Sequence, residues 1–320
     1  MKTGKQGKKT KKMNRDAKVF YWVMFSLPLL QFLIFYVGVN FNSILMAFQD
    51  IFVERDYASG GVRYVTKFVG LDTFKQFIAV ELSSVTGKFA SAIPNSLIYL
   101  VFSIIVVIPL GLLFSYYVYK KMPMSGVFRT FLFLPSVICS LIMVIFYNSI
   151  VDQVYPAFAQ MLTGVRPEGL LASDKTAFLA VAFFSVFFAF GPSTLIYVNA
   201  MSQISPSVIE SAELDGATGL KQFTKIVLPM IFPSIVSYIV ISFAQVAVNQ
   251  LNAFSFFGTA AGDMKADSIG YVLFNYVADT AQSSQSYSIA SAGGILFTLI
   301  VAPVTLLIKW ALEKYGPSED

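Results

Sequence analysis

The sequence has no histidine, one cysteine and few charged residues, and each shortage excludes a class of protein. Without histidine there is no Ser-His or Cys-His catalytic pair and no thiolate–imidazole metal site. Cys139 stands alone and cannot form an intramolecular disulfide. Of the 320 residues, 13% are charged and 56% hydrophobic, whereas soluble domains average about 25% and about 45–50%. These proportions predict an integral membrane protein.

The charges are also unevenly placed, and they leave six long intervals without any. These intervals are residues 19–49, 89–119, 130–151, 176–209, 226–262 and 280–308. About 20 apolar residues suffice to cross the hydrocarbon core as a helix. We therefore predict an all-α integral membrane protein whose six transmembrane helices lie near residues 20–47, 95–119, 130–150, 177–201, 229–255 and 286–308.

The charge bias between the connecting segments predicts the orientation. With the N-terminus inside, the inner segments hold 15 Lys and Arg residues and the outer ones 8, while acidic residues number 7 inside and 11 outside. Positive charge accumulates on the cytoplasmic side, so both termini are expected in the cytoplasm of a plasma-membrane protein. The basic run 1–18 then serves as a topological anchor, although nucleic-acid or anionic-lipid binding is an alternative. The first apolar stretch is too long for a cleaved signal peptide.

The segment between the fourth and fifth predicted helices has helix-start and helix-stop signals. Ser205 before Pro206 suits an N-cap followed by proline, and Ser207 with Glu210 has capping-box spacing. Gly216 and Gly219 then allow a tight reversal. The pattern predicts a short helix on the cytoplasmic face, after which Leu228-Pro229 would begin the fifth membrane helix. On this local pattern alone, an ordinary linker is an equal alternative.

The long-range spacing of this segment resembles the EAA loop of binding-protein-dependent ABC importer permeases. That loop has the pattern E-A-A, three residues, G, nine residues, I-x-L-P. The matching positions are Glu210, Ser211, Ala212, Gly216, Ile226, Leu228 and Pro229, and only Ser211 departs, as one small residue for another. The stretches 131–135 and 287–292 are also similar to those of sugar permeases, in the branch of the maltose and glycerol-phosphate permeases.

This resemblance implies a type I importer permease fold and a division of labour between subunits. The partners it implies are a cytoplasmic ABC ATPase dimer, a second permease subunit, an extracellular solute-binding protein and a carbohydrate, without nucleic acid. The loop would form a coupling helix on the ATPase, with Glu210 and Asp215 as polar contacts, Ala212 as a close-packing position and Gly216 as the turn. The chain itself has no G-x-x-x-x-G-K-[ST] motif, so ATP would be hydrolysed by a separate subunit.

The predicted spans contain no charged residue, which favours a neutral solute and argues against proton coupling. The fifth span has four polar residues spaced 3, 4 and 3 apart, on one face of a helix: Ser242, Gln245, Asn249 and Asn252. They would either line a sugar pathway or bond helix to helix. The resemblance favours the pathway, although Val246 stands where the maltose permease has a polar residue. Gly191-Pro192 would break the fourth helix, with Tyr197 and Asn199 as weaker pathway candidates.

The expected organisation is a basic N-terminus (1–18), a first helix with an extracellular segment of at most short helices (19–88), a transporter core (89–312) containing the coupling loop 205–229, and a cytoplasmic tail (313–320). We predict the permease subunit of an ATP-driven sugar or oligosaccharide importer, with no catalytic residue, metal site or cofactor of its own. The alternatives are a permease for another neutral solute, a secondary carrier or channel, and a membrane enzyme.

Overall fold

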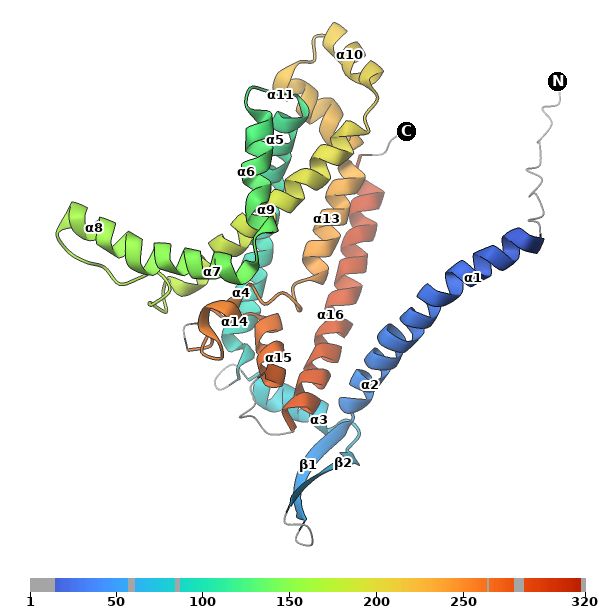
Figure 1. Cartoon of the computed structure of the whole chain (residues 1–320), viewed down its shortest axis with the longest axis vertical. Helices are drawn as coiled ribbons and strands as arrows, with labels where there is room; N and C mark the ends of the chain where they lie inside the picture. The colour runs from blue at the N-terminus through green and yellow to red at the C-terminus, as the bar shows by residue number, and fades with distance from the viewer. Residues whose placement is uncertain (1–14, 57–60, 84–86, 264, 279–284, 318–320) are drawn as a thin grey trace.

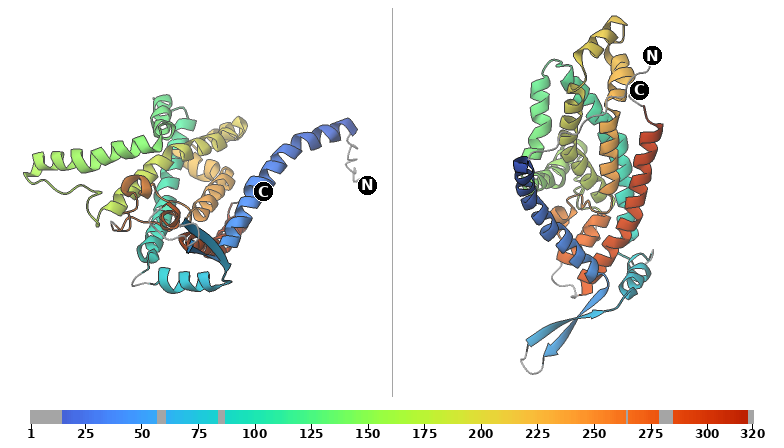
Figure 2. Two further views of the ribbon diagram at one scale, coloured as in Figure 1. Left: turned by 60° about the horizontal axis from the view of Figure 1, so that its bottom comes forward. Right: turned by 90° about the vertical axis from the view of Figure 1, so that its right-hand side faces the viewer.

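A computed structural model describes residues 15–56, 61–83, 87–263, 265–278 and 285–317. The chain forms an elongated helical bundle with α10 (Pro206–Leu214) at one end and a β-hairpin at the other (Figure 1). The first helices and α8 (Tyr155–Thr163) project to opposite sides of this bundle (Figures 1 and 2). Most of the predicted basic N-terminus, residues 1–14, and the last three tail residues lie outside the described part of the chain.

The first predicted span is confirmed as a helix. It comprises α1 (Arg15–Gln31), the π-helical segment η1 (Phe32–Gly38) and α2 (Val39–Met46). None of its most apolar window is buried against the rest of the chain. A helix that is apolar on every side is stable only in lipid or against another subunit.

The prediction of a purely helical protein is wrong in the segment that follows. β1 (Gln49–Asp56) and β2 (Gly61–Phe68) pair antiparallel, with Gln49 opposite Phe68 and Asp56 opposite Gly61. Two short helical pieces, α3 (Asp72–Gln76) and η2 (Phe77–Glu81), then lead back to the bundle. The segment therefore holds a strand pair in addition to the short helices expected there.

The centre of the bundle consists of long helices that pack closely through small and hydroxyl side chains. Its members are α4 (Phe89–Phe102), η3 (Ser103–Val107), α5 (Ile108–Tyr119) and α9 (Ala177–Ser202), and α16 (Gln285–Tyr315) runs along one side of the bundle (Figure 1). Between α5 and α9, the buried Ser115 hydroxyl donates to the Thr194 carbonyl at 2.9 Å. A Cβ on Gly111 would lie 3.2 Å from Ser193 Oγ, so the close approach of these two helices depends on that glycine.

The third predicted span, residues 130–150, is not one helix. α6 (Ser125–Val137) ends at Ile138, whose ψ of 143° is extended, and a second helix runs through α7 (Ser140–Ser149), η4 (Ile150–Val154) and α8. This second helix lies across the bundle axis (Figure 1). It also contains Asp152, which lies two residues beyond the predicted span. The Asp152 carboxylate accepts the Leu171 amide hydrogen at 3.0 Å, which gives this charge a partner within the chain.

The fifth predicted span, residues 229–255, is wrong at both ends. Helix already begins at residue 219, with α11 (Gly219–Gln222), η5 (Phe223–Val227) and α12 (Leu228–Met230), and bends by 69° before α13 (Phe232–Ala244). Pro229 and Pro233 flank this bend, and each lacks an amide hydrogen. The helix then stops at Ala244, and Leu251 and Asn252 have φ values of +54° and +58°, which no α-helix contains.

The remaining helices close the hairpin end of the bundle. α15 (Ile269–Ala278) packs against α16 and α14 (Ala253–Phe257) against α15, and the rings of Phe77, Phe89 and Phe297 contact one another nearby. By length and composition, the described residues contain five helices able to cross a membrane, or up to six if the bent pair counts as one span. The chain is thus a mostly helical multi-pass membrane protein.

Candidate functional site

The predicted helix between the fourth and fifth spans exists as α10. Ser205 is its N-cap residue and Pro206 its first helical residue, as expected. The predicted capping box of Ser207 and Glu210 is absent, because Ser207 already lies within the helix. The N-cap residue Ser205 makes no side-chain cap bond, and its hydroxyl lies 2.8 Å from that of Ser207. The fixed φ of Pro206 therefore does more to start this helix than a side-chain cap does.

The end of α10 is a Schellman motif built on Gly216. The Ala217 amide donates to the Ala212 carbonyl at 2.8 Å and the Gly216 amide to the Glu213 carbonyl at 3.1 Å. Gly216 has a φ of +75°, the left-handed conformation that this motif requires. Ala212 and Ala217 are both buried, and they supply the apolar contact that accompanies such a cap. The predicted roles of Ala212 in packing and of Gly216 in the turn fit this geometry.

The two faces of α10 differ in chemistry. One face of α10 contacts the neighbouring helices, and it holds Ile209, Ala212 and Glu213 at i, i+3 and i+4 spacing. Glu210, Ser211 and Asp215 are exposed, and Leu214 is 90% exposed. α10 thus presents an acidic and apolar surface at the end of the molecule.

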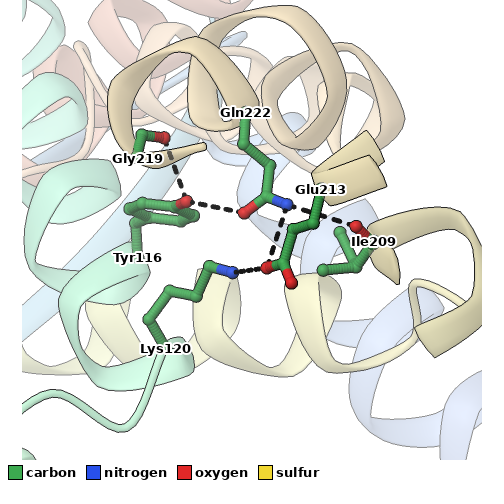
Figure 3. Close-up of polar contacts among 6 residues, drawn as sticks. All are labelled: Tyr116, Lys120, Ile209, Glu213, Gly219 and Gln222. Atoms are coloured by element: carbon green, nitrogen blue, oxygen red, sulfur yellow. Dashed lines mark hydrogen bonds and ion pairs between the residues drawn. The ribbon is translucent and has the colours of Figure 1, made fainter. Parts of the chain in front are cut away.

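A polar network fixes α10 to its neighbours (Figure 3). Lys120, just after α5, donates to the Glu213 carboxylate at 2.9 Å. Gln222 of α11 is fully buried, and its amide group donates to the Ile209 carbonyl at 3.4 Å and to Glu213 at 3.5 Å. The Tyr116 hydroxyl lies 3.1 Å from both the Gln222 side-chain oxygen and the Gly219 carbonyl. The Lys120 ammonium first, and then Gln222, lower the pKa of Glu213, which keeps this exposed carboxylate ionised.

Sequence reasoning did not assign Tyr116, Lys120, Glu213 or Gln222 to the site. Lys120 and Glu213 are 93 positions apart, so no local pattern joins them. The predicted positions Ile226, Leu228 and Pro229 are half-buried in η5 and α12, before the bend. Leu228-Pro229 therefore ends the first part of a bent helix, where the sequence suggested the beginning of a membrane helix.

Replacing Gln222 by leucine should destabilise this end of the molecule. The variant keeps the side-chain volume but leaves the Ile209 carbonyl without its side-chain donor and Tyr116 without one acceptor, at a cost of about 1–3 kcal/mol. Lys221→Leu is the matched control, because Lys221 is exposed on the same turn. Thermal unfolding in detergent measures both. Equal midpoints for the two variants would show that the network contributes nothing.

A cavity of about 290 Å³ lies where α13 unwinds. All four polar residues predicted for the pathway line it: Ser242, Gln245, Asn249 and Asn252. They do not share one helix face as predicted, since only Ser242 lies within α13 and the other three follow its last residue, Ala244. Non-helical backbone at membrane depth is tolerated where it is buried in protein or lines a cavity.

The unwound segment 245–252 is held by its own polar groups. The Asn249 side-chain oxygen accepts the Leu251 amide hydrogen at 2.9 Å, and its backbone carbonyl accepts the Ser268 hydroxyl at 2.8 Å. Ser185 of α9 donates to the Leu251 carbonyl at 3.1 Å. The rest of the lining is aromatic, hydroxylic or apolar: Ser96, Tyr99, Leu100, Ser103, Ser185, Phe188, Ala189, Pro192, Ser193, Ile196, Tyr238, Ile241, Val246, Leu251 and Ser268. None of these side chains carries a formal charge at neutral pH.

The weaker pathway candidates on the fourth span lie elsewhere. Tyr197 is buried against Tyr238 and Asn199 is exposed, and neither lines the cavity. The predicted break at Gly191-Pro192 is wrong, because α9 continues through it to Ser202. Gly191 packs against the backbone of α6, and the Ser193 and Thr194 hydroxyls donate back to the Phe190 carbonyl. Pro192 and Ser193 nevertheless line the cavity.

A buried carboxylate joins α4 to the loop before α15. Asp267 is 2% exposed and accepts the Ser91 hydroxyl at 2.8 Å, while Asn95 donates to the Asp267 and Lys265 carbonyls at 2.9 Å each. Burial raises the pKa of Asp267 to about 6, against the lowering effect of these hydrogen bonds. Lys88 and Asp263 line the cavity beside it, and the Lys265 ammonium lies 3.2 Å from Asp174.

This raised pKa predicts a pH-dependent stability. Between about pH 4 and about pH 6 the folded protein holds a proton that the unfolded chain releases, so the free energy of unfolding falls as pH rises through that window, by on the order of 2 kcal/mol. Asp267→Asn removes this dependence. Thermal unfolding of both proteins is measured near pH 5 and pH 7.5. At the higher pH the unfolding midpoint of the variant should rise relative to that of the native chain. A constant difference between them would contradict the assignment.

The sequence and the fold have known counterparts. Residues 107–318 match the family described as binding-protein-dependent transport system inner membrane component. The multiple sugar-binding transport system permease protein MsmF of Streptococcus mutans is 23% identical over 294 residues, which cover 91% of this chain and 94% of MsmF. The arabinooligosaccharides transport system permease protein AraP of Bacillus subtilis is also 23% identical, over 89% of this chain and 86% of AraP.

A chain of a bacterial alginate ABC transporter, solved in complex with an alginate pentasaccharide-bound periplasmic protein, has the same fold. It superposes with a TM-score of 0.73 over 95% of this chain and 98% of that one, at 19% identity. This superposition covers more of the chain than the residues matched by the family.

Proposed function

The chain belongs to the binding-protein-dependent transport system inner membrane component family, and from that premise we propose that it is the permease subunit of an ATP-driven importer for a neutral sugar or oligosaccharide. The single observation that carries this proposal is the cavity at the end of α13. Its amides and hydroxyls can donate to and accept from sugar hydroxyls, and its lining has no formal charge to attract an ionic solute. The names of MsmF and AraP, both sugar permeases, support the same substrate class.

Energy would come from a separate ATPase dimer that docks on α10. The exposed acidic and apolar face of α10 suits a protein partner, and the network behind it ties the helix to α5 and α11. Movement of the ATPase would therefore displace these elements together and shift the bundle from one packing arrangement of its helices to another. In this arrangement the present chain binds no ATP and catalyses no reaction.

With the ATPase docked on α10, the orientation of the chain in the membrane and the places of the other partners follow. α10 and both termini would face the cytoplasm, with the bent helix counted as one of six spans in the plasma membrane. The hairpin end would then face an extracellular solute-binding protein. A second permease subunit would cover part of the exposed apolar surface of α1 and α8, where Leu27 and Met161 are 74% and 84% exposed.

Uptake by cells tests this function. Cells producing the chain should accumulate labelled neutral di- and trisaccharides, and cells lacking it should not. Depletion of ATP should stop uptake, whereas collapse of the proton gradient at constant ATP should not. Uptake that follows the proton gradient would instead identify a secondary carrier, and downhill flux without ATP would identify a channel.

A further inference from the structure

A second polar cavity lies at the hairpin end of the molecule, outside the site described above. It has a volume of about 420 Å³, within the range of small-molecule sites, which is about 300–1,000 Å³. Its walls are the start of α4, the loop between α14 and α15, and α15 itself. The residues that matter for its chemistry are Lys88, Asp263, Asp267, Asn275 and Tyr276.

One side-chain atom in this wall, the side-chain oxygen of Asn275, is buried without a hydrogen-bond partner among the described residues. The adjacent Tyr276 is 4% exposed, and its hydroxyl has the Glu81 carboxylate as a neighbouring acceptor. Lys88 lies over the Tyr276 ring at 4.3 Å. Buried polar atoms normally have partners, so an unpartnered one beside a cavity indicates a place for a polar ligand.

The composition of the wall limits what that ligand can be. Two carboxylates against one ammonium disfavour an anion. A divalent cation is disfavoured by the same ammonium, and the described residues contain no group of three or more potential acidic or thiol ligands. Asn275 and Asp267 offer acceptors, Lys88 offers a donor and Tyr276 offers both. A neutral polyhydroxylated molecule matches this mixture, because each hydroxyl both donates and accepts.

The two cavities share two walls. On α4, Ser91 faces the hairpin-end cavity and Ser96 faces the cavity at α13, about 7.5 Å apart by the rise of the helix. On the loop, Asp267 lines the first and Ser268 the second. Between them lie the bonds from Asn95 to the Asp267 carbonyl and from the Ile269 amide to Ser96 Oγ. The cavities are therefore in series, separated by one layer of hydrogen bonds.

We propose that the hairpin-end cavity is a second saccharide subsite, which binds a neutral sugar unit through Asp267, Asn275 and Tyr276 before that unit reaches the cavity at α13. This proposal rests on the proposed function for its direction of transport. Binding at this subsite would raise the local concentration of solute beside the inner cavity. Its loss should therefore raise the KM for uptake more than it lowers the maximal rate.

Cysteine protection tests occupancy without requiring transport. In a Cys139→Ser background, Thr259→Cys places a thiol on the cavity wall, and Ala260→Cys places one on the adjacent exposed residue outside it. Membranes containing the assembled complex are treated with a maleimide, with and without maltose, trehalose or an arabinotriose. At least one saccharide should slow labelling at position 259 several-fold and leave position 260 unchanged. Protection by Ca²⁺ or by glucuronate alone would overturn the neutral-sugar assignment.

The variant Tyr276→Phe completes the test, since it removes one hydroxyl and keeps the ring. It should weaken protection and raise the uptake KM about fivefold, the effect of one neutral hydrogen bond. Normal uptake with no protection at position 259 overturns the subsite and leaves the proposed function intact. Protection without saccharide uptake supports the subsite and rejects the import function. Absence of both rejects both.

Discussion

Replacing Gly216 by valine is expected to lower ATP-driven uptake at least tenfold while the protein remains in the membrane. Gly216 has a φ of +75°, and no atom lies within 4 Å of the place where its Cβ would be. The penalty is therefore conformational, about 1–2 kcal/mol for an L-residue in the left-handed region and more for a β-branched one. The chain can relieve it only by undoing the Schellman motif, which would turn α10 away from its docking position.

Two matched controls separate this effect from general instability. Gly164→Val has the same strain, with a φ of +76° and open space around it, at the far end of α8. Gly126→Val is equally open but has an ordinary φ, in the first turn of α6. Both should retain uptake close to that of the native chain. If Gly164→Val lost uptake as completely as Gly216→Val, backbone strain at either glycine would be enough to stop uptake, and α10 would have no special role.

Replacing Gln245 by leucine should reduce saccharide uptake about tenfold without affecting assembly with the ATPase. Gln245 lines the cavity at α13, and within the described residues its side-chain amide makes no hydrogen bond, so the substitution should cost the fold little. A bound sugar would lose one or two hydrogen bonds, because leucine has no donor or acceptor. The sugar hydroxyls that give up water on binding would then be left without a partner. Initial uptake rates over a range of saccharide concentrations measure the loss.

Asn199→Leu is the control for this variant. Asn199 is a polar residue of the fourth span that was predicted for the pathway, but it is exposed and lies outside the cavity. Its uptake should equal that of the native chain. An equal loss in both variants, or a loss confined to Asn199→Leu, would place the pathway elsewhere.

The coupling loop could be predicted from the sequence because its signals are local. A proline at the first helical position and a glycine just past the end define α10 within a few residues, and the long motif spacing identifies its family. Its attachment to the bundle could not be predicted, since the Lys120–Glu213 pair depends on how α10 lies against the end of α5.

The four polar residues predicted for a pathway line one cavity, but not as one face of a helix, and their role in transport stays a prediction. Hydropathy does not distinguish a helix from an unwound apolar segment, so residues 245–252 resembled a continuation of α13. The end of α13 at Ala244 and the positive φ values at Leu251 and Asn252 reveal the interruption. The hairpin is not among the predicted elements, although its sequence pattern is local. Two runs rich in Val, Ile, Phe and Tyr lie on either side of Ser59-Gly60-Gly61.

The central claim is that a separate ATPase drives this pathway through α10, and cross-linking from α10 in living cells tests it most directly. A photoreactive maleimide on Ser211→Cys, in the Cys139→Ser background, reports the neighbours of the exposed face of α10, with Ala260→Cys as the control at the opposite end. The account predicts that the protein captured from position 211 contains a nucleotide-binding P-loop and that the control captures none. Capture of that ATPase from position 260, or labelling of position 211 from outside the cell, would contradict it.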